Sequence, residues 1–143
     1  MTPHLLDVNV LIALVRQKHS HHEKVTRWFK ATGHRQWATC GFTEAGFVRV
    51  LCNPSFTAHA ITVSEALHLL SELTGLAGHR FWSIEEGLSV LARPFEERFF
   101  GHQQVTDAHL LGLALRNQGK LVTLDRGLAF LAGEEFSGNL LVL

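Results

Sequence analysis

Residues 5–14, LLDVNVLIAL, place a carboxylate, Asp7, and an amide, Asn9, inside a continuous apolar run. Such a run predicts a strand buried on both faces of a parallel sheet, with a helix after it. An ionised Asp in this position is costly to bury unless a partner group compensates it. Parallel sheets place ligand-binding groups at the carboxyl ends of their strands, so Asp7 is a candidate for such a group. It can equally cap a helix that begins at Val8, and this segment alone leaves both roles open.

The chain of 143 residues predicts one domain, 1–143, and its 46% hydrophobic content is enough for a full core. Thirteen basic and thirteen acidic residues cancel, which argues against a protein that coats DNA non-specifically but leaves room for local contacts to RNA. Cys40 and Cys52 are too few for a disulfide framework and lack metal-ligand spacing, so we expect both to act as small, buried hydrophobic residues. The opening MTPHLLD has no cationic leader region, and no apolar run has the length of a membrane span. We therefore expect a cytoplasmic protein without membrane association.

The rest of the chain alternates between extended and helical patterns. Strands are predicted at 36–39, 79–82, 120–124 and 140–143. Capping boxes at 20–23, 62–65 and 83–86 predict three helix starts, and further helices are predicted at 8–17, from Thr43 to Asn53, at 106–117 and after Gly127. Short connections and apolar, non-alternating strands indicate an α/β fold, with a central, mainly parallel sheet flanked by helices on both faces.

Capping boxes and polar surface patches explain most of the acidic residues. The four that remain are Asp7, Glu44, Asp107 and Asp125, which include every Asp of the chain. Two of them follow apolar strands, and the other two come at predicted helix starts, directly after a threonine. These positions share one edge of a parallel sheet, so the four acids can converge there. Each also has a local alternative, as a partner of a helix dipole or as a turn residue.

Carboxylates crowded on one edge repel one another unless a cation lies between them. Oxygen ligands of this kind suit Mg²⁺ or Mn²⁺, which retain water ligands and also bind phosphate. Such a cation can activate a water molecule and stabilise the charge that develops on a phosphodiester.

Four segments carry a resemblance to a known family: LLDVNVLIAL, TEAGFVRVL, QVTDAHLLGLAL and LVTLDRGL. They resemble the motifs of the PIN domain family, and more narrowly those of the VapC-type toxins of bacterial toxin–antitoxin systems. The segments occur in the family's order and span nearly the whole chain. The resemblance implies a Mg²⁺- or Mn²⁺-dependent endoribonuclease that is held inactive by a cognate antitoxin and usually forms a homodimer.

The resemblance also implies roles for the four acids. Asp7 and Asp107 resemble the principal metal ligands, Glu44 the third acid, and Asp125 a fourth that acts directly or through water. Asn9 is expected to form a hydrogen bond within the site.

Polar and basic neighbours of the acids complete the predicted site. Thr43, Thr106 and Thr123 resemble hydroxyls that support the carboxylates, although helix capping explains the first two equally well. Arg49 and Arg126 are candidates for contacts to RNA phosphates, and the alternative is that they are solvated or paired with the acids.

For the antitoxin, we expect a hydrophobic groove near the site, formed by helices of the first half of the chain. The apolar residues expected to contribute to it are Val25, Trp28 and Phe29.

Three other functions are compatible with parts of the sequence. The order Asp7-Val8-Asn9-Val10 resembles the DxD segment of haloacid-dehalogenase-like phosphatases, but Asn9 stands where that family needs an acid. A non-catalytic binding module has no need for four mutually repelling acids. A PIN nuclease that acts in RNA maturation or on DNA structures would share the same site.

Overall fold

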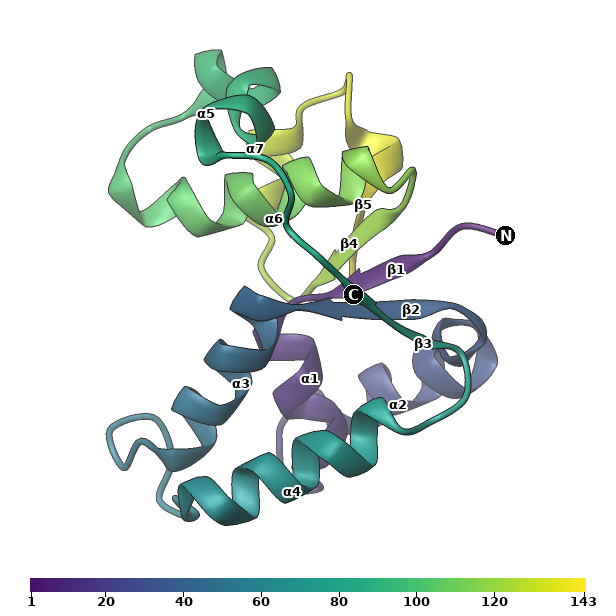
Figure 1. Cartoon of the computed structure of the whole chain (residues 1–143), viewed down its shortest axis with the longest axis vertical. Helices are drawn as coiled ribbons and strands as arrows, with labels where there is room; N and C mark the ends of the chain where they lie inside the picture. The colour runs from purple at the N-terminus through teal and green to yellow at the C-terminus, as the bar shows by residue number, and fades with distance from the viewer.

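The computed structural model describes residues 1–143 and shows one sheet of five strands in the order β3-β2-β1-β4-β5 (Figure 1). All four neighbouring pairs are parallel, so the predicted α/β fold with a mainly parallel sheet is confirmed. The strands are β1 (His4–Leu6), β2 (Trp37–Cys40), β3 (His79–Trp82), β4 (Lys120–Thr123) and β5 (Leu140–Val142).

β1 occupies the centre of the sheet because it is apolar on both faces. Leu5 and Leu6 are fully buried and point to opposite sides, so each belongs to a different hydrophobic core. Leu5 lies in register with Ala38 of β2 and Leu121 of β4. A strand covered on both faces needs apolar side chains at successive positions, which explains the continuous run in the sequence.

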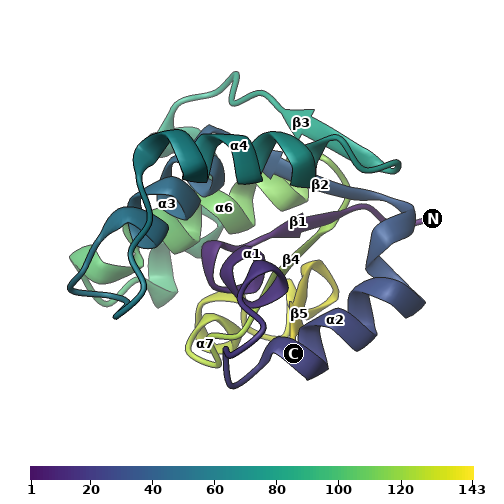
Figure 2. The same cartoon turned by 90° about the horizontal axis from the view of Figure 1, so that it is seen from below.

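Seven α-helices cover the two faces of the sheet. They are α1 (Val8–Val15), α2 (His22–Ala31), α3 (Gly41–Cys52), α4 (Val63–Thr74), α5 (Leu88–Leu91), α6 (Val105–Arg116) and α7 (Leu128–Ala132). The first four lie on one side of the sheet and the last three on the other (Figure 1), and Figure 2 views the molecule from the side of the first four. Short 3₁₀ turns are η1 (Gly33–Arg35), η2 (Arg93–Arg98), η3 (His102–Gln104) and η4 (Ser137–Asn139).

α6 is the most deeply buried helix, with an unbroken buried stretch over residues 108–114. Gly112 allows α5 to cross it closely, since a Cβ atom there would overlap the carbonyl oxygen of Leu91. This packing fixes α6 against the sheet and therefore fixes the position of Asp107 in its first turn.

One of the three predicted capping boxes is confirmed. The hydroxyl of Thr62 accepts from the Glu65 backbone N–H at 3.1 Å, and the Glu65 carboxylate accepts from the Thr62 N–H at 3.3 Å. The box at 20–23 is wrong, because the N-cap of α2 is His21 and no side chain caps that helix. Nδ1 of the next residue, His22, instead bonds the carbonyl oxygen of Ala13 at 2.7 Å and ties α2 to α1.

The box predicted at 83–86 is also wrong, because α5 begins only at Leu88, after Gly87. The Ser83 hydroxyl donates to the Glu85 side chain at 3.3 Å and not to a helix end. Glu86 forms an ion pair with Arg116 of α6. Its carboxylate is therefore engaged in a tertiary contact and not in the helix cap that the local pattern predicted.

Two remaining expectations concern cysteines and membranes. Cys40 is buried and Cys52 half-buried, as expected for small hydrophobic residues. None of the helices combines the length and the apolar character needed to cross a membrane.

Candidate active site

Asp7 follows β1 directly and is the N-cap of α1. Its Oδ1 accepts from the backbone N–H of Val8 at 2.8 Å, and its Oδ2 accepts from the hydroxyl of Thr123 at 2.8 Å. Only 9% of Asp7 is exposed. Burial raises the pKa of this carboxyl above its usual value, although both hydrogen bonds oppose the change. The two roles left open by the sequence coincide, because Asp7 caps the helix and presents a buried carboxylate at the sheet edge.

Thr123, the last residue of β4, holds the centre of the site. Its hydroxyl donates to Asp7 and accepts from the Asp125 backbone N–H at 3.1 Å and from Nδ2 of Asn9 at 3.3 Å. Oδ1 of Asn9 in turn accepts from the backbone N–H of Leu124 at 3.1 Å. A hydroxyl has one proton and two lone pairs, so the hydrogen-bonding capacity of Thr123 is fully used. The predicted positions Asn9 and Thr123 therefore link the ends of β1 and β4.

Asp107 and Asp125 complete a cluster of three aspartates. Asp107 lies in the first turn of α6, is half-buried, and its carboxylate has no hydrogen-bond partner. Its pKa is raised to about 6, first by burial and then by the negative charges of Asp7 and Asp125. Asp125 is exposed at the turn after β4, where its Oδ1 accepts from the Gly127 N–H at 2.9 Å. The three carboxylates are therefore close enough to repel one another.

Glu44 lies apart from this cluster. Its Oε2 accepts from the Thr39 hydroxyl at 2.5 Å, and the same hydroxyl lies 2.8 Å from Nε2 of His79. Because the Thr39 hydroxyl donates its one hydrogen to Glu44, its oxygen accepts a hydrogen bond from the imidazole N–H. The charge of Glu44 does not contribute to the raised pKa values of Asp7 and Asp107. The structure thus brings three of the four predicted acids together and holds Glu44 toward β2 and β3.

The three threonines that were predicted to support the carboxylates also differ in their contacts. Thr43 is buried, and its hydroxyl bonds the N–H and the carbonyl oxygen of Cys40 at 2.9 and 3.2 Å, so it caps α3. Thr106 is exposed, and its hydroxyl forms no hydrogen bond. Thr43 therefore takes the capping role that the sequence left open for it, Thr106 contacts none of the acids, and Thr123 alone of the three bonds a carboxylate.

Arg49 and Arg126 are both exposed and make no ion pair. The ion pairs of the chain are His68–Glu72 and Arg116–Glu86, so neither candidate arginine is neutralised by the acids. Both remain available for an anionic ligand.

The donor set fits a hard divalent cation. No three His, Cys, Asp or Glu side chains are arranged to hold a metal ion by themselves. Mg²⁺, however, is commonly held by one or two carboxylates and completes its shell with water and substrate phosphate. Asp7 and Asp107 would hold such an ion, because Asp7 presents its carboxylate at the carboxyl end of β1 and the Asp107 carboxylate, with no hydrogen-bond partner, is exposed to the negative charges of Asp7 and Asp125.

Sequence reasoning missed Thr39 and His79. A signal existed for Thr39, which is a polar residue in a strand that is otherwise apolar and fully buried. His79 offered none, because its contact joins residues 40 positions apart and depends on the pairing of β2 with β3.

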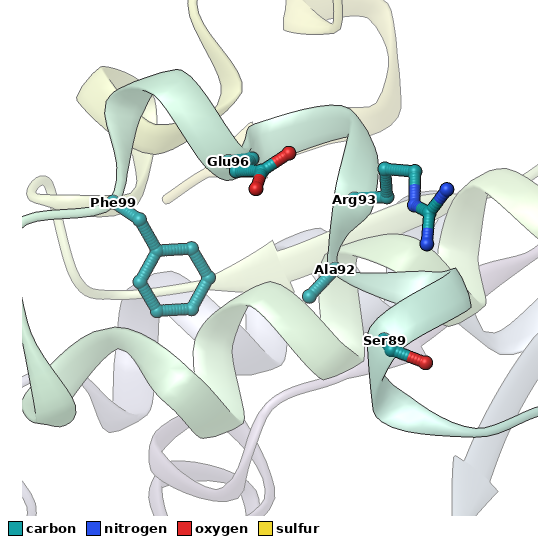
Figure 3. A pocket seen from close by; sticks show the side chains of 5 residues that line it. All are labelled: Ser89, Ala92, Arg93, Glu96 and Phe99. Carbon is teal, nitrogen blue, oxygen red and sulfur yellow. The ribbon is translucent and has the colours of Figure 1, made fainter.

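A shallow hollow of about 450 Å³ lies over α5 and η2, and none of the four predicted site acids lines it (Figure 3). Its lining residues are Ser89, Ala92, Arg93, Glu96 and Phe99. Their polar groups do not converge, since Arg93 and Ser89 lie at one end and the Phe99 ring at the other. The acidic edge, and not this hollow, is therefore the candidate site.

Comparison with proteins of known sequence identifies close relatives. Ribonuclease VapC38 of Mycobacterium tuberculosis is 45% identical over 128 residues, which cover 90% of this chain and 89% of that protein. Ribonuclease VapC44 of the same species is 39% identical over 128 residues, with the same coverage of both proteins.

Solved structures share the fold at lower sequence identity. FitAcB from Neisseria gonorrhoeae superposes with a TM-score of 0.63 at 18% identity, covering 90% of this chain and 92% of that one. PAE2754 from Pyrobaculum aerophilum gives 0.62 at 21% identity, covering 97% of this chain and 83% of that one. The sequence model of the PIN domain matches residues 4–134, which include all four acids. The chain therefore belongs to the PIN domain family.

Proposed function

We propose that the protein is a metal-dependent endoribonuclease and the toxin of a toxin–antitoxin pair, with Asp7, Asp107 and Asp125 at its centre. The observation that carries the proposal is the convergence of these three aspartates at the carboxyl edge of the sheet, with two raised pKa values. Membership of the PIN domain family and identity of up to 45% with proteins named ribonucleases support it.

Each residue of the cluster has a distinct task in this proposal. Asp7 is held rigidly by Thr123 and by the start of α1, so it fixes where the cation binds. Asp107 has no hydrogen-bond partner and is free to turn its oxygens to the same ion. Bound Mg²⁺ or Mn²⁺ supplies activation of the attacking water and neutralises charge on the phosphodiester. Asp125 is more exposed, and its negative charge adds to the attraction for the cation.

Glu44 has contacts of its own outside the aspartate cluster. It lies in the first turn of α3, and the hydrogen bond from Thr39 directs its carboxylate toward His79. We propose that it contributes to the cation site through water, or after leaving Thr39.

The experiment is cleavage of a single-stranded RNA by the purified protein, with and without Mg²⁺ or Mn²⁺. Hydrolysis by water leaves 5′-phosphate and 3′-hydroxyl ends, and we expect these ends only when the metal is present. Asp107→Asn should abolish cleavage, whereas Glu134→Gln, at an exposed acid outside the site, should not. Full activity in excess EDTA, or a 2′,3′-cyclic phosphate product, would overturn the mechanism.

Assays with DNA substrates and a search for a phosphorylated intermediate separate the rival functions. A PIN nuclease that acts on DNA structures would cleave branched or duplex DNA in preference to RNA. A haloacid-dehalogenase-like phosphatase would form an aspartyl-phosphate on Asp7. Both oxygens of that carboxylate are hydrogen-bonded and the residue is only 9% exposed, which does not favour nucleophilic attack.

The cognate antitoxin and the homodimer belong to the same proposal. The groove expected from Val25, Trp28 and Phe29 is not formed by these residues, because Val25 is buried and the two aromatic rings pack against the core. Trp28 lies edge-on to His4, and Phe29 lies edge-on to Trp37.

A different hollow, of about 220 Å³, lies between the carboxyl-terminal ends of α1 and α3. Ile12, Leu51 and Phe56 contribute apolar surface to it, and Arg16 and Lys18 contribute positive charge. We propose that an acidic, amphipathic antitoxin segment binds there. Homodimerisation is tested by light scattering on the purified protein.

A further inference from the structure

Phe42 is an exposed aromatic residue at the edge that carries the acids. It lies in the first turn of α3, two residues before Glu44, and 46% of its surface is exposed. The bonds between Thr43 and Cys40 fix this helix start, so the backbone that carries Phe42 is held in place. A single exposed apolar side chain is ordinary on a protein surface. Phe42 is distinguished from the other exposed phenylalanines by its place at the start of α3, at the edge that carries the acids.

The ring of Phe42 rests on His109 of α6. The two ring centroids are 4.8 Å apart with an angle of 61° between the planes, and His109 is only 8% exposed. Nε2 of His109 is buried without a hydrogen-bond partner, so the contact between the imidazole and Phe42 is one of ring packing. His109 lies two residues after Asp107 in α6 and on a different side of that helix, so the aromatic pair is within one helical turn of Asp107 along the axis.

A positively charged side chain, that of Arg49, lies further along the same face of α3. Phe42, Ala45 and Arg49 are all exposed and are spaced by three and seven residues, so they form one stripe. Arg49 lies about 10 Å beyond Phe42 along the helix axis, and it makes no ion pair. No carboxylate belongs to this stripe, since Glu44 lies on another face and accepts from Thr39.

We propose that this stripe binds the RNA strand, with a nucleobase stacked on Phe42 and a backbone phosphate on Arg49. The inference rests on the proposed ribonuclease function and names the residues that position its substrate. A flat ring and an unpaired guanidinium are the two components that bind single-stranded RNA without a sequence requirement. The stripe begins at the catalytic edge, so a strand whose phosphate reaches the aspartates also passes over it.

The test measures binding of a short fluorescein-labelled single-stranded RNA to full-length protein carrying Asp107→Asn, which prevents cleavage. Adding Phe42→Leu should weaken binding about tenfold, the size of one base–aromatic stack. Phe42→Trp should restore it. Arg49→Gln should lower the slope of log affinity against log salt by about 0.7, because one phosphate contact is lost. Phe42→Leu should leave that slope unchanged.

The matched control is Phe81→Leu, at an exposed phenylalanine of the edge strand β3, outside the stripe. It should leave RNA affinity unchanged. Equal loss of affinity in Phe42→Leu and Phe42→Trp, with a lowered melting temperature, would mean that Phe42 only packs against His109. Unchanged RNA affinity in Phe42→Leu, with a changed oligomeric state or lost antitoxin binding, would assign the stripe to a protein partner. Either result overturns the inference, whereas absence of metal-dependent RNA cleavage by the parent protein would overturn the proposed function itself.

Discussion

At the scale of single residues, Asp107 differs from the other acids of the site because nothing in the protein compensates its charge. Asp7 receives two hydrogen bonds and Asp125 receives one, whereas the Asp107 carboxylate receives none. Its pKa of about 6 therefore lies close to the pH at which the protein would work. The ionised form is unfavourable in the metal-free protein, and this is the free energy that a bound cation recovers.

This difference predicts how stability depends on pH. The folded-state pKa of Asp107 is raised above the unfolded value of about 4. Its contribution to the free energy of unfolding is therefore fully present below pH about 4, and it is lost as the pH rises through about 6. In EDTA, we expect Asp107→Asn to melt at or above the temperature of the parent at neutral pH, by a margin that shrinks on acidification. Thermal melts at several pH values check this.

The same thermal melts can be repeated with Mg²⁺ in place of EDTA. Mg²⁺ should raise the melting temperature of the parent and change that of Asp107→Asn little, because the variant lacks one of the two ligands. An Asn variant that melts well below the parent in EDTA would show that Asp107 is a structural residue of the α6 start. Glu134→Gln, at an exposed acid outside the site, should respond to Mg²⁺ as the parent does.

At the scale of elements, α6 is the part of the scaffold on which the site depends most. It carries Asp107 and His109, is buried over residues 108–114, and packs against both the sheet and α5. The crossing with α5 has no room for a side chain at Gly112. A larger residue there must separate two helices, because the atom that it would meet is a backbone oxygen.

Gly112→Ala is therefore expected to lower the free energy of unfolding by about 1–3 kcal/mol, the usual range for overpacking. RNA cleavage should fall as well, because α6 would shift and move Asp107 relative to Asp7. Urea titration and cleavage assays measure the two effects. Gly138→Ala is the control, because a Cβ atom added there would meet no other atom within 4 Å. Equal stability of the two variants would contradict the close crossing of α5 and α6.

At the scale of the whole molecule, charge is balanced but unevenly placed. The formal net charge is zero, while three of the thirteen acidic residues gather at the carboxyl edge. Arg126 directly follows one of them, Asp125, and Arg49 lies further along α3; neither arginine forms an ion pair. Attraction of RNA therefore depends on local cations and not on the field of the whole protein. A partner that covers this edge would block both the metal site and the RNA path.

Expression of the chain alone in bacteria should therefore arrest growth, and co-expression with the product of its genetic neighbour should relieve the arrest. Co-purification of the two proteins would identify the antitoxin. Asp107→Asn should be harmless by itself and should still bind the partner, because its shape is almost unchanged. The toxin assignment fails if the neighbour neither binds the protein nor restores growth.

The sequence by itself determined the architecture and the chemical type of the site. Continuous apolar runs specify strands buried on both faces, and such strands form a parallel sheet whose carboxyl ends share one edge. Asp7, Asp107 and Asp125 could be placed at that edge because each directly follows a strand or begins a helix. This inference needs only connectivity and periodicity, and both are local properties of the chain.

Only the tertiary structure decided which side chains meet. Glu44 accepts a hydrogen bond from Thr39 and lies apart from the aspartates. Glu86 forms an ion pair with Arg116 and does not form the helix cap that the sequence predicted. The ring of Phe42 packs against His109, a residue of another helix. These contacts join positions far apart in the sequence, and they depend on strand register and helix crossing. A local pattern states which groups a residue can bind, whereas packing decides which of those groups lies within reach.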